Sequence, residues 1–518
     1  MSLVRAMATV GGLTLVSRVA GFVRDILTAG ILGAGPIADA FFVALKLPNL
    51  FRRLFAEGAF SVSFVPLYSA ELETGGRRSA DRFAENALAW MIAVLLPLTV
   101  VAMAAMPWIV PVIAPGFADD PERYGAAVTF ARITFPYLVL MSLVALLGGV
   151  LNARDRFAPF ASAPVLFNLT LIAALLVVAP LLDTAGHALS YAVTASGAVQ
   201  LIWLAYWAQR AGVRLHLRLP RPSARFALLL RKMGPGALGA GAMQINLFFD
   251  TLLASLLPTG AISYLYYADR LYQLPLGVIG IAIGTALLPL MSRQIAAETA
   301  GAGPQAALAT QNRALEYGVL LALPAGFALM AVPGPILTVL FERGAFDAAT
   351  TVQTAAALAA YALGIPAYIL VKVLSTAFFA RQDTATPVRI AIACTGLNIA
   401  LSFALIWVIA HMGIALATAV SAWLNVALLV RAQMRQGTWR PDARLSHRVP
   451  RLVVAAIAMG LVVLGLAQIL APGFAGGLVM QVASLVVLVA VGAAVYGGVA
   501  VLLGGVVVAD LKALARRR

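Results

Sequence analysis

The stretch VMQVASLVVLVAVGAAVYGGVAVLLGGVVV, residues 479–508, contains no charged residue. A helix needs about 20 mostly apolar residues to cross a bilayer, so this stretch predicts a membrane-spanning helix. The whole chain agrees, because 62% of its 518 residues are hydrophobic and only 11% are charged. An average soluble domain carries roughly 25% charged residues. The sequence therefore predicts an integral membrane protein.

Similar apolar stretches recur along the whole chain and predict an all-α protein of 14 transmembrane helices. The predicted spans are 7–31, 37–70, 83–107, 126–151, 158–181, 188–209, 234–257, 262–291, 314–333, 350–379, 387–410, 412–431, 451–471 and 479–508. The first of them carries charges and no clean cleavage site, so we expect it to be retained rather than removed as a signal peptide.

The basic residues are distributed unevenly over the predicted loops. The chain has 37 Lys and Arg against 21 Asp and Glu, a net charge of +16. Loops on one side of the predicted topology carry nearly all the loop cations, whereas the opposite loops hold only Arg123 and Arg343. By the positive-inside rule, both termini are expected to be cytoplasmic. The basic excess is thus mainly a topology signal, and no nucleic-acid partner is expected.

The sequence lacks the residues that several classes of chemistry require. No GxxxxGK[ST] motif is present, which argues against a built-in ATPase. The single cysteine, Cys394, cannot form an internal disulfide, and the four histidines are far apart in the sequence. We therefore expect no cofactor.

A weak internal repeat points to two related halves. Residues 59–69, late in the second span, are similar to residues 282–292, late in the eighth. Spans six apart that run in the same direction indicate two six-helix lobes related by an axis along the membrane normal. A chance match between apolar segments is the alternative. The expected division is an N-terminal lobe over 1–210, a C-terminal lobe over 211–436, and a final helix pair over 437–518.

Cations inside predicted spans mark a candidate site, because each costs about 2.5–3.5 kcal/mol at a helix centre on insertion scales. Six of them cluster on the first, second and eighth spans: Arg18, Arg24, Lys46, Arg52, Arg53 and Arg270. Five acids lie on these spans and the seventh: Asp25, Asp39, Glu57, Asp250 and Asp269. One interpretation is that these charges pair to fix helix packing. The other is a hydrated cavity whose arginines bind a multiply charged anion such as a diphosphate, which the planar guanidinium suits.

Particular segments resemble a known family. Ser17 to Asp25 (SRVAGFVRD) and Ala38 to Phe60 (ADAFFVALKLPNLFRRLFAEGAF) resemble the MurJ (MviN) family of lipid II flippases, as do residues 114–118, 266–270 and 381–384. The family belongs to the superfamily of multidrug and oligosaccharide-lipid exporters. The resemblance implies a transporter rather than an enzyme, with two lobes and a C-terminal helix pair.

The same resemblance implies a substrate and a role. Lipid II, an undecaprenyl-diphosphate-linked disaccharide-pentapeptide, would be moved from the cytoplasmic to the periplasmic leaflet of the bacterial inner membrane. This step serves peptidoglycan synthesis and hence cell-wall biogenesis and cell shape. The other expected partners are membrane lipids and proteins of cell-wall synthesis.

The resemblance also assigns residues. Those expected to bind the substrate are Arg18, Arg24, Arg52, Arg270 and Asp39. The resemblance places Ala29, Ser263 and Glu57 at the gate or in the cavity, and the charge pattern of the same spans adds Arg53, Asp25 and Asp269. The two last spans are expected to form a groove for the isoprenoid tail.

One departure from the family concerns sodium, which some members bind. Asp250 and Asp383 could correspond to ligands, but the residue one turn before Asp383 is Phe379, a poor one. Hard cations need several oxygen ligands, so no metal site is expected. Without an ATP site, the membrane potential or the consumption of lipid II would drive transport.

Two alternatives to lipid II transport remain. The first is an exporter of another polyprenyl-diphosphate oligosaccharide, or a cation-coupled drug exporter, of the same superfamily; in a drug exporter carboxylates would dominate the cavity. The second is a membrane glycosyltransferase or polyprenyl-phosphate enzyme. It is disfavoured because the largest region between spans, 210–233, is rich in arginine and poor in acids.

Overall fold

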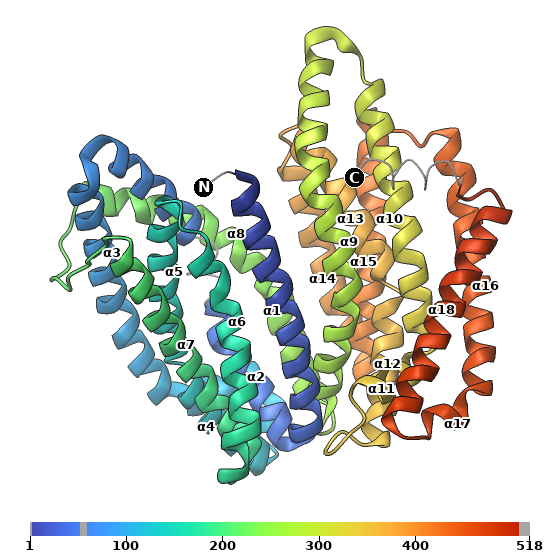
Figure 1. The fold of residues 1–518 in the computed structure, drawn as a ribbon, viewed down its shortest axis with the longest axis horizontal. Helices are drawn as coiled ribbons and strands as arrows, with labels where there is room; N and C mark the ends of the chain where they lie inside the picture. The colour runs from blue at the N-terminus through green and yellow to red at the C-terminus, as the bar shows by residue number, and fades with distance from the viewer. Residues whose placement is uncertain (1–2, 52–59, 507–518) are drawn as a thin grey trace. The chain divides into compact units, whose positions relative to one another are not determined.

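The computed structural model describes residues 3–51 and 60–506, which form helices joined by turns (Figure 1). Among these residues, ten helical stretches have the length and hydropathy of membrane spans. They are Ser61–Ile113, Pro121–Ala153, Ala158–Leu181, Ala185–Arg210, Gln305–Ala331, Ala348–Ala380, Ala385–Ile409, His411–Arg435, Ala443–Ile469 and Leu478–Leu502. The prediction of an all-α chain with many apolar spans is confirmed, whereas the number 14 stays a prediction.

Contacts divide the chain into two compact units. Unit 1 comprises Met1–Ser263 together with Gly344–Phe346, and unit 2 comprises Tyr264–Arg343 and Asp347–Arg518. The short segment of unit 1 is joined to α1 by a backbone hydrogen bond, in which the Ala345 N–H donates to the Gly30 carbonyl at 2.8 Å.

Unit 1 is a bundle in which α1 packs on α6, α2 on α4, α3 on α5, and α7 on α4, α5 and α6. Its helices are α1 (Leu3–Leu32), α2 (Pro36–Phe51), α3 (Ser61–Ile113), α4 (Pro121–Thr134), α5 (Tyr137–Ala153), α6 (Ala158–Ala173), α7 (Ala185–Arg210) and α8 (Ala224–Ser255). Fully buried aromatic side chains such as Phe42, Phe64 and Phe130 fill the spaces between them. Close packing of this kind holds helices together in lipid, where the hydrophobic effect gives no drive between them.

Prolines and glycines account for breaks between helical segments, both inside a predicted span and between two of them. The span predicted over 126–151 is two helices, α4 and α5, that meet at Phe135–Pro136. Proline has no N–H to donate and its ring clashes with the preceding turn, so the helix is interrupted there. In α3, Gly76 adopts φ 70° and joins two helical segments across a kink.

The segment between α7 and α8 runs along the polar end of α3. Glu85 of α3 is 4% exposed and accepts from the backbone N–H of His216 at 3.0 Å. The same carboxylate pairs with Arg218 at 2.6 Å, and Trp90 stacks on Phe226 at the start of α8. Arg218 of this segment, expected from sequence as a topology signal, therefore also neutralises a buried acid of α3.

Unit 2 contains α9 and the C-terminal helices. They are α9 (Ala261–Ala297), of which the first three residues belong to unit 1, α10 (Gln305–Ala331), α11 (Pro333–Leu340), α12 (Ala348–Ala362), α13 (Ile365–Ala380), α14 (Ala385–Ile409), α15 (His411–Arg435), α16 (Ala443–Ile469), α17 (Ala471–Phe474) and α18 (Leu478–Leu502). Helix α16 packs on both α10 and α18, through a buried apolar cluster that includes Leu452, Met459 and Leu488.

A buried carboxylate joins α10 to α16. Glu316 of α10 is 3% exposed and pairs with Arg444 at 3.1 Å, with Arg448 at 2.5 Å and with Arg313. Arg313 also pairs with Asp442, which caps the N-terminus of α16 by accepting from the Leu445 N–H. This network fixes the C-terminal helices to the rest of unit 2.

Candidate substrate and gate residues

Helix α1 holds two of the predicted substrate residues. Arg18 is exposed, and within the described part of the chain it forms no hydrogen bond or ion pair. Arg24 is largely buried, with a side chain 14% exposed, and pairs with the adjacent Asp25 at 2.6 Å. The two arginines of α1 therefore occupy different environments: Arg18 is exposed, and Arg24 is fixed by side-chain contacts.

A second helix holds Arg24 in place. Arg24 Nη1 donates to the side-chain oxygen of Asn168 in α6 at 2.9 Å, and the guanidinium lies 5.6 Å from the centre of the Phe167 ring. The Asn168 amide donates in turn to the Ser17 carbonyl at 3.0 Å. Sequence analysis did not identify Asn168, although an asparagine in an apolar span is itself a signal, since polar side chains there hydrogen-bond across helices.

Asp39 lies at the centre of a buried hydrogen-bond network. Its carboxylate is fully buried and accepts from the Gly260 N–H at 2.7 Å, from the Ser263 N–H at 2.9 Å and from the Ser263 hydroxyl at 2.6 Å. These donors lie at the N-terminus of α9, where backbone N–H groups have no partner inside the helix. In this structure Asp39 therefore bonds to the protein itself, and its assignment to the substrate stays a prediction.

Arg123 approaches Asp39 from α4. It was expected in an outer loop, but its side chain is only 8% exposed and its Nη1 lies 3.8 Å from Asp39 Oδ2. Its guanidinium packs over Phe117 at 4.7 Å from the ring centre. Hydropathy alone could not reveal this position, because Arg123 is near a chain turn and its burial depends on neighbouring helices.

The turn that carries Phe117 explains one of the sequence motifs. Pro115–Phe117 form a short 3-10 turn, and the Gly116 N–H donates to the Ser255 hydroxyl at 3.2 Å. A Cβ at Gly116 would lie 2.1 Å from the Ser255 carbonyl oxygen. Only glycine permits so close an approach of the turn to the end of α8.

The other predicted residues have different surroundings. Ala29 and Ser263, the expected gate pair, are both fully buried, and Lys46 donates to Thr251 at 2.8 Å. In unit 2, Arg270 packs over Tyr266 at 4.6 Å from the ring centre, and Asp269 accepts from Gln273. Arg52, Arg53 and Glu57 lie outside the described residues.

The two residues compared with sodium ligands, Asp250 and Asp383, have local partners. Asp250 accepts from the Asn246 amide at 3.1 Å, and Asp383 accepts from the Thr386 N–H at 3.0 Å at the start of α14. That backbone donor lowers the pKa of Asp383, because it stabilises the charged form. In the described ranges, no three His, Cys, Asp or Glu residues come together as a metal site.

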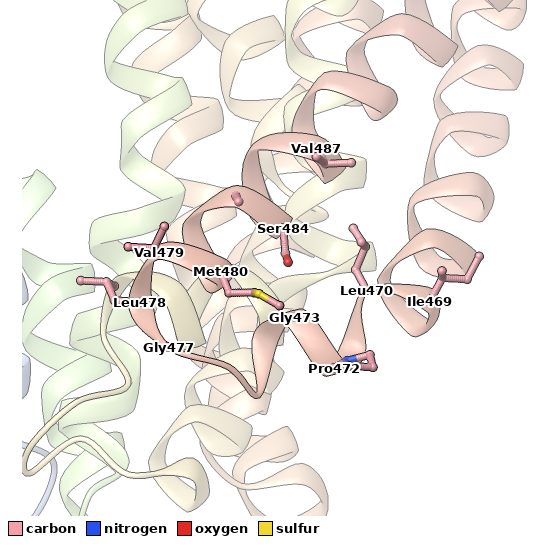
Figure 2. Close-up of a pocket in the computed structure, with 11 residues that line it drawn as sticks. Ile469, Leu470, Pro472, Gly473, Gly477, Leu478, Val479, Met480, Ser484 and Val487 are labelled. Carbon is pink, nitrogen blue, oxygen red and sulfur yellow. The ribbon is translucent and has the colours of Figure 1, made fainter.

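An apolar groove lies where α16, α17 and α18 meet, with a volume of about 760 Å³ (Figure 2). Leu470, Met480, Ser484 and Val487 are among its lining residues. Figure 2 shows Met480 and Ser484 from α18 facing the segment that contains Pro472 and Gly473. The lining suits a hydrocarbon chain, since it offers almost no polar group to a ligand.

Together, the apolar helices and the arginines set into them define the class of molecule: a multi-pass, all-α membrane protein with buried polar side chains between its helices. Its fold resembles that of solved transporters. A structure described as lipid II flippase MurJ in an inward closed conformation has a TM-score of 0.77 at 23% identity, with 95% of this chain and 97% of that chain covered. An inward-facing multidrug resistance MATE family transporter has a TM-score of 0.68 at 16% identity, with 81% and 94% covered.

Sequence comparisons identify the family. The model of the family described as lipid II flippase MurJ matches residues 28–507. A probable lipid II flippase MurJ of Rhizobium meliloti (strain 1021) is 46% identical over 89% of this chain and 86% of its own length. That of Rhizobium tropici is 42% identical over 100% of this chain and 97% of its own. The chain therefore belongs to the lipid II flippase MurJ family, and it is a bacterial membrane transporter rather than an enzyme.

Proposed function

We propose that this protein moves lipid II from the cytoplasmic to the periplasmic leaflet of the inner membrane by alternating access, for peptidoglycan synthesis. Beyond family membership, the observation that carries the proposal is the pair of arginines on α1. Arg18 is exposed, and Arg24 is held by Asp25 and Asn168. A cation placed within a membrane span is costly unless it serves a polar cavity or a partner, and a diphosphate is such a partner.

The proposed topology and division follow the sequence analysis. Fourteen spans place both termini in the cytoplasm, with lobes over 1–210 and 211–436 and a helix pair over 437–518. In this topology α16 runs outward and α18 runs inward, so the apolar groove lies toward the periplasmic end. We assign that groove to the isoprenoid tail.

We assign each residue a role according to the chemistry of the part of the substrate that it would contact. Arg18, Arg24, Arg52 and Arg270 contact the diphosphate, since guanidinium groups bind phosphate oxygens in pairs and stay charged in a dry site. Carboxylates near them limit the net positive charge, so that the anion is bound but can also be released. A ligand shifts the balance between two conformations only through its different affinity for each, so the grip on the diphosphate must differ between them.

The test is translocation of fluorescent lipid II in liposomes that contain the purified protein. We expect Arg18→Ala and Arg24→Ala each to slow translocation at least about tenfold, because each removes a charged hydrogen-bond donor to the diphosphate. Arg78→Ala, a change at an exposed arginine on a polar part of α3, is the matched control and should keep normal rates. Normal rates in both α1 variants would contradict the proposal.

Two further measurements define the substrate and the energy source. Competition with undecaprenyl diphosphates that carry other glycans should leave lipid II transport largely unaffected; a preference for another glycan would point to a different exporter. Collapse of the membrane potential should slow translocation if the potential drives the cycle. Unchanged rates would leave consumption of lipid II as the driving process.

A further inference from the structure

The carboxylate of Asp39 accepts all its described hydrogen bonds from one short segment of the chain. Both oxygens are engaged, Oδ1 by the backbone and hydroxyl of Ser263 and Oδ2 by the Gly260 N–H. The side chain is fully buried in this structure, so its partners here are protein groups rather than water. Any movement of Gly260–Ser263 away from α2 removes three hydrogen bonds from one buried charge.

Arg123 forms a long ion pair with this carboxylate but donates no hydrogen bond to it. Its Nε donates to Asp120 at 2.9 Å and its Nη2 donates to the Gly116 carbonyl at 3.4 Å. Its Nη1 is buried and has no hydrogen-bond partner among the described residues. This nitrogen is 3.8 Å from Asp39 Oδ2, which is too long for a hydrogen bond but close enough for a small shift to form one.

Asp39 therefore accepts hydrogen bonds from Gly260 and Ser263, while Arg123 Nη1 lies close enough to donate one after a small shift. A buried charge that loses its partners strongly destabilises the state in which it is left alone. The guanidinium is already oriented by Asp120, Gly116 and Phe117, so little order must be gained when it takes over. A donor that is oriented in advance costs less conformational entropy to engage.

We propose that Arg123 is the alternate partner of Asp39 and makes this carboxylate a two-position switch. In the present structure Asp39 bonds to Gly260 and Ser263. When that segment moves and Ala29 becomes accessible, Arg123 Nη1 bonds to Asp39 and compensates for the lost donors. Arg123 is thus a positioning residue for the gate. The inference rests on the proposed alternating-access function.

Accessibility of a cysteine at position 29 gives the test. The background is Cys394→Ser, which removes the single natural cysteine, and Ala29→Cys adds a reporter that is fully buried in this structure. The full-length protein in liposomes is treated with a membrane-impermeant maleimide. Arg123→Gln should slow labelling about tenfold, because the open state loses the compensating bond, whereas Arg123→Lys should retain much of the rate.

The dependence on residue 39 separates a switch from a structural role. With Asp39→Asn no buried charge needs compensation, so adding Arg123→Gln should change labelling less than about twofold. Arg132→Gln, at an exposed arginine on the same helix, should label like the background protein. Elution as a single monodisperse species on size exclusion checks that each variant is folded.

Several outcomes would overturn the inference. Labelling that is unchanged or faster in Arg123→Gln would do so, as would an equal effect in the Asp39→Asn background or a background protein that never labels. If Arg123→Gln fails to fold, the labelling rate of Arg123→Lys is measured instead. A tenfold slower labelling of Arg123→Lys in the Asp39→Asn background would also contradict the switch. The measurement needs no lipid II, so the proposed substrate can fail while the switch holds.

Discussion

Arg24 of α1 donates a hydrogen bond of 2.9 Å to the side-chain oxygen of Asn168 in α6, a residue 144 positions away in the sequence. The acceptor is neutral, so it orients the guanidinium without cancelling its charge. Asp25 holds the opposite edge and does reduce the charge. The two contacts together fix the geometry of a charged group in advance, which under the proposed function would lower the cost of binding the diphosphate.

The first prediction concerns this acceptor. Asn168→Asp has nearly the same shape but puts a second carboxylate beside Arg24, so we expect lipid II affinity to fall about tenfold through repulsion of the diphosphate. Asn168→Ala should weaken binding less, because it loosens the guanidinium without adding charge. Dissociation constants from native mass spectrometry test this order. Equal affinity for Asn168→Asp and the parent protein would show that Asn168 is only a packing residue.

The second prediction concerns the Glu316 network. Glu316→Gln leaves three arginines around a neutral amide, and breaking a buried charge pair in this way costs roughly 3–5 kcal/mol. We expect a clear loss of thermal stability in detergent. Glu73→Gln alters an exposed glutamate of α3 and should stay within about 0.5 kcal/mol of the parent protein. Similar melting of both variants would refute a stabilising role for the network.

The third prediction uses two glycines of unit 1. Gly116→Ala places a Cβ 2.1 Å from the Ser255 carbonyl oxygen and must displace the turn or the end of α8. Gly125→Ala meets no atom within 4 Å in helix α4 and should stabilise the helix by up to about 1 kcal/mol. Melting temperatures should therefore shift in opposite directions. A shift in the same direction would mean that the contact at Gly116 does not constrain the fold.

The fourth prediction tests the apolar groove. Ala483→Trp fills part of the lining with a large side chain and should slow translocation of lipid II that carries the full undecaprenyl tail. A shortened tail that does not reach the groove should be moved at the parent rate. Ala493→Trp, at an exposed position of the same helix α18, is the control. Equal slowing for both tail lengths would argue against a tail groove.

Much of the fold was predictable because its causes are local. The break before α2 follows from Gly33, with φ 66°, and from Pro36 at the first position of the helix. Other breaks were missed. The span predicted over 350–379 is two helices, α12 and α13, that meet at Leu363–Gly364. A mean hydropathy averaged over a window cannot detect a bend inside an apolar run.

The candidate site was predictable only in part. Arg18 and Arg24 were predicted because a cation in an apolar helix is conspicuous, and the apolar run over 7–31 placed both on the first span. Arg123 was misjudged as a loop residue, since its 8% exposure results from packing against α2 and the 115–117 turn. Asn168 carries no charge and was overlooked for that reason.

The sequence by itself determined that the chain is a bundle of membrane helices, which spans carry cations, and which family it resembles. These properties follow from hydropathy and motif, which are read along a single segment. Only the tertiary structure decided that Asp39 bonds to Gly260 and Ser263 with Arg123 as a nearby ion-pair partner. The same is true of the hydrogen bond by which Asn168 orients Arg24. The reason is physical: a buried polar group must find its partner in space, and helix packing determines which distant residue that partner is.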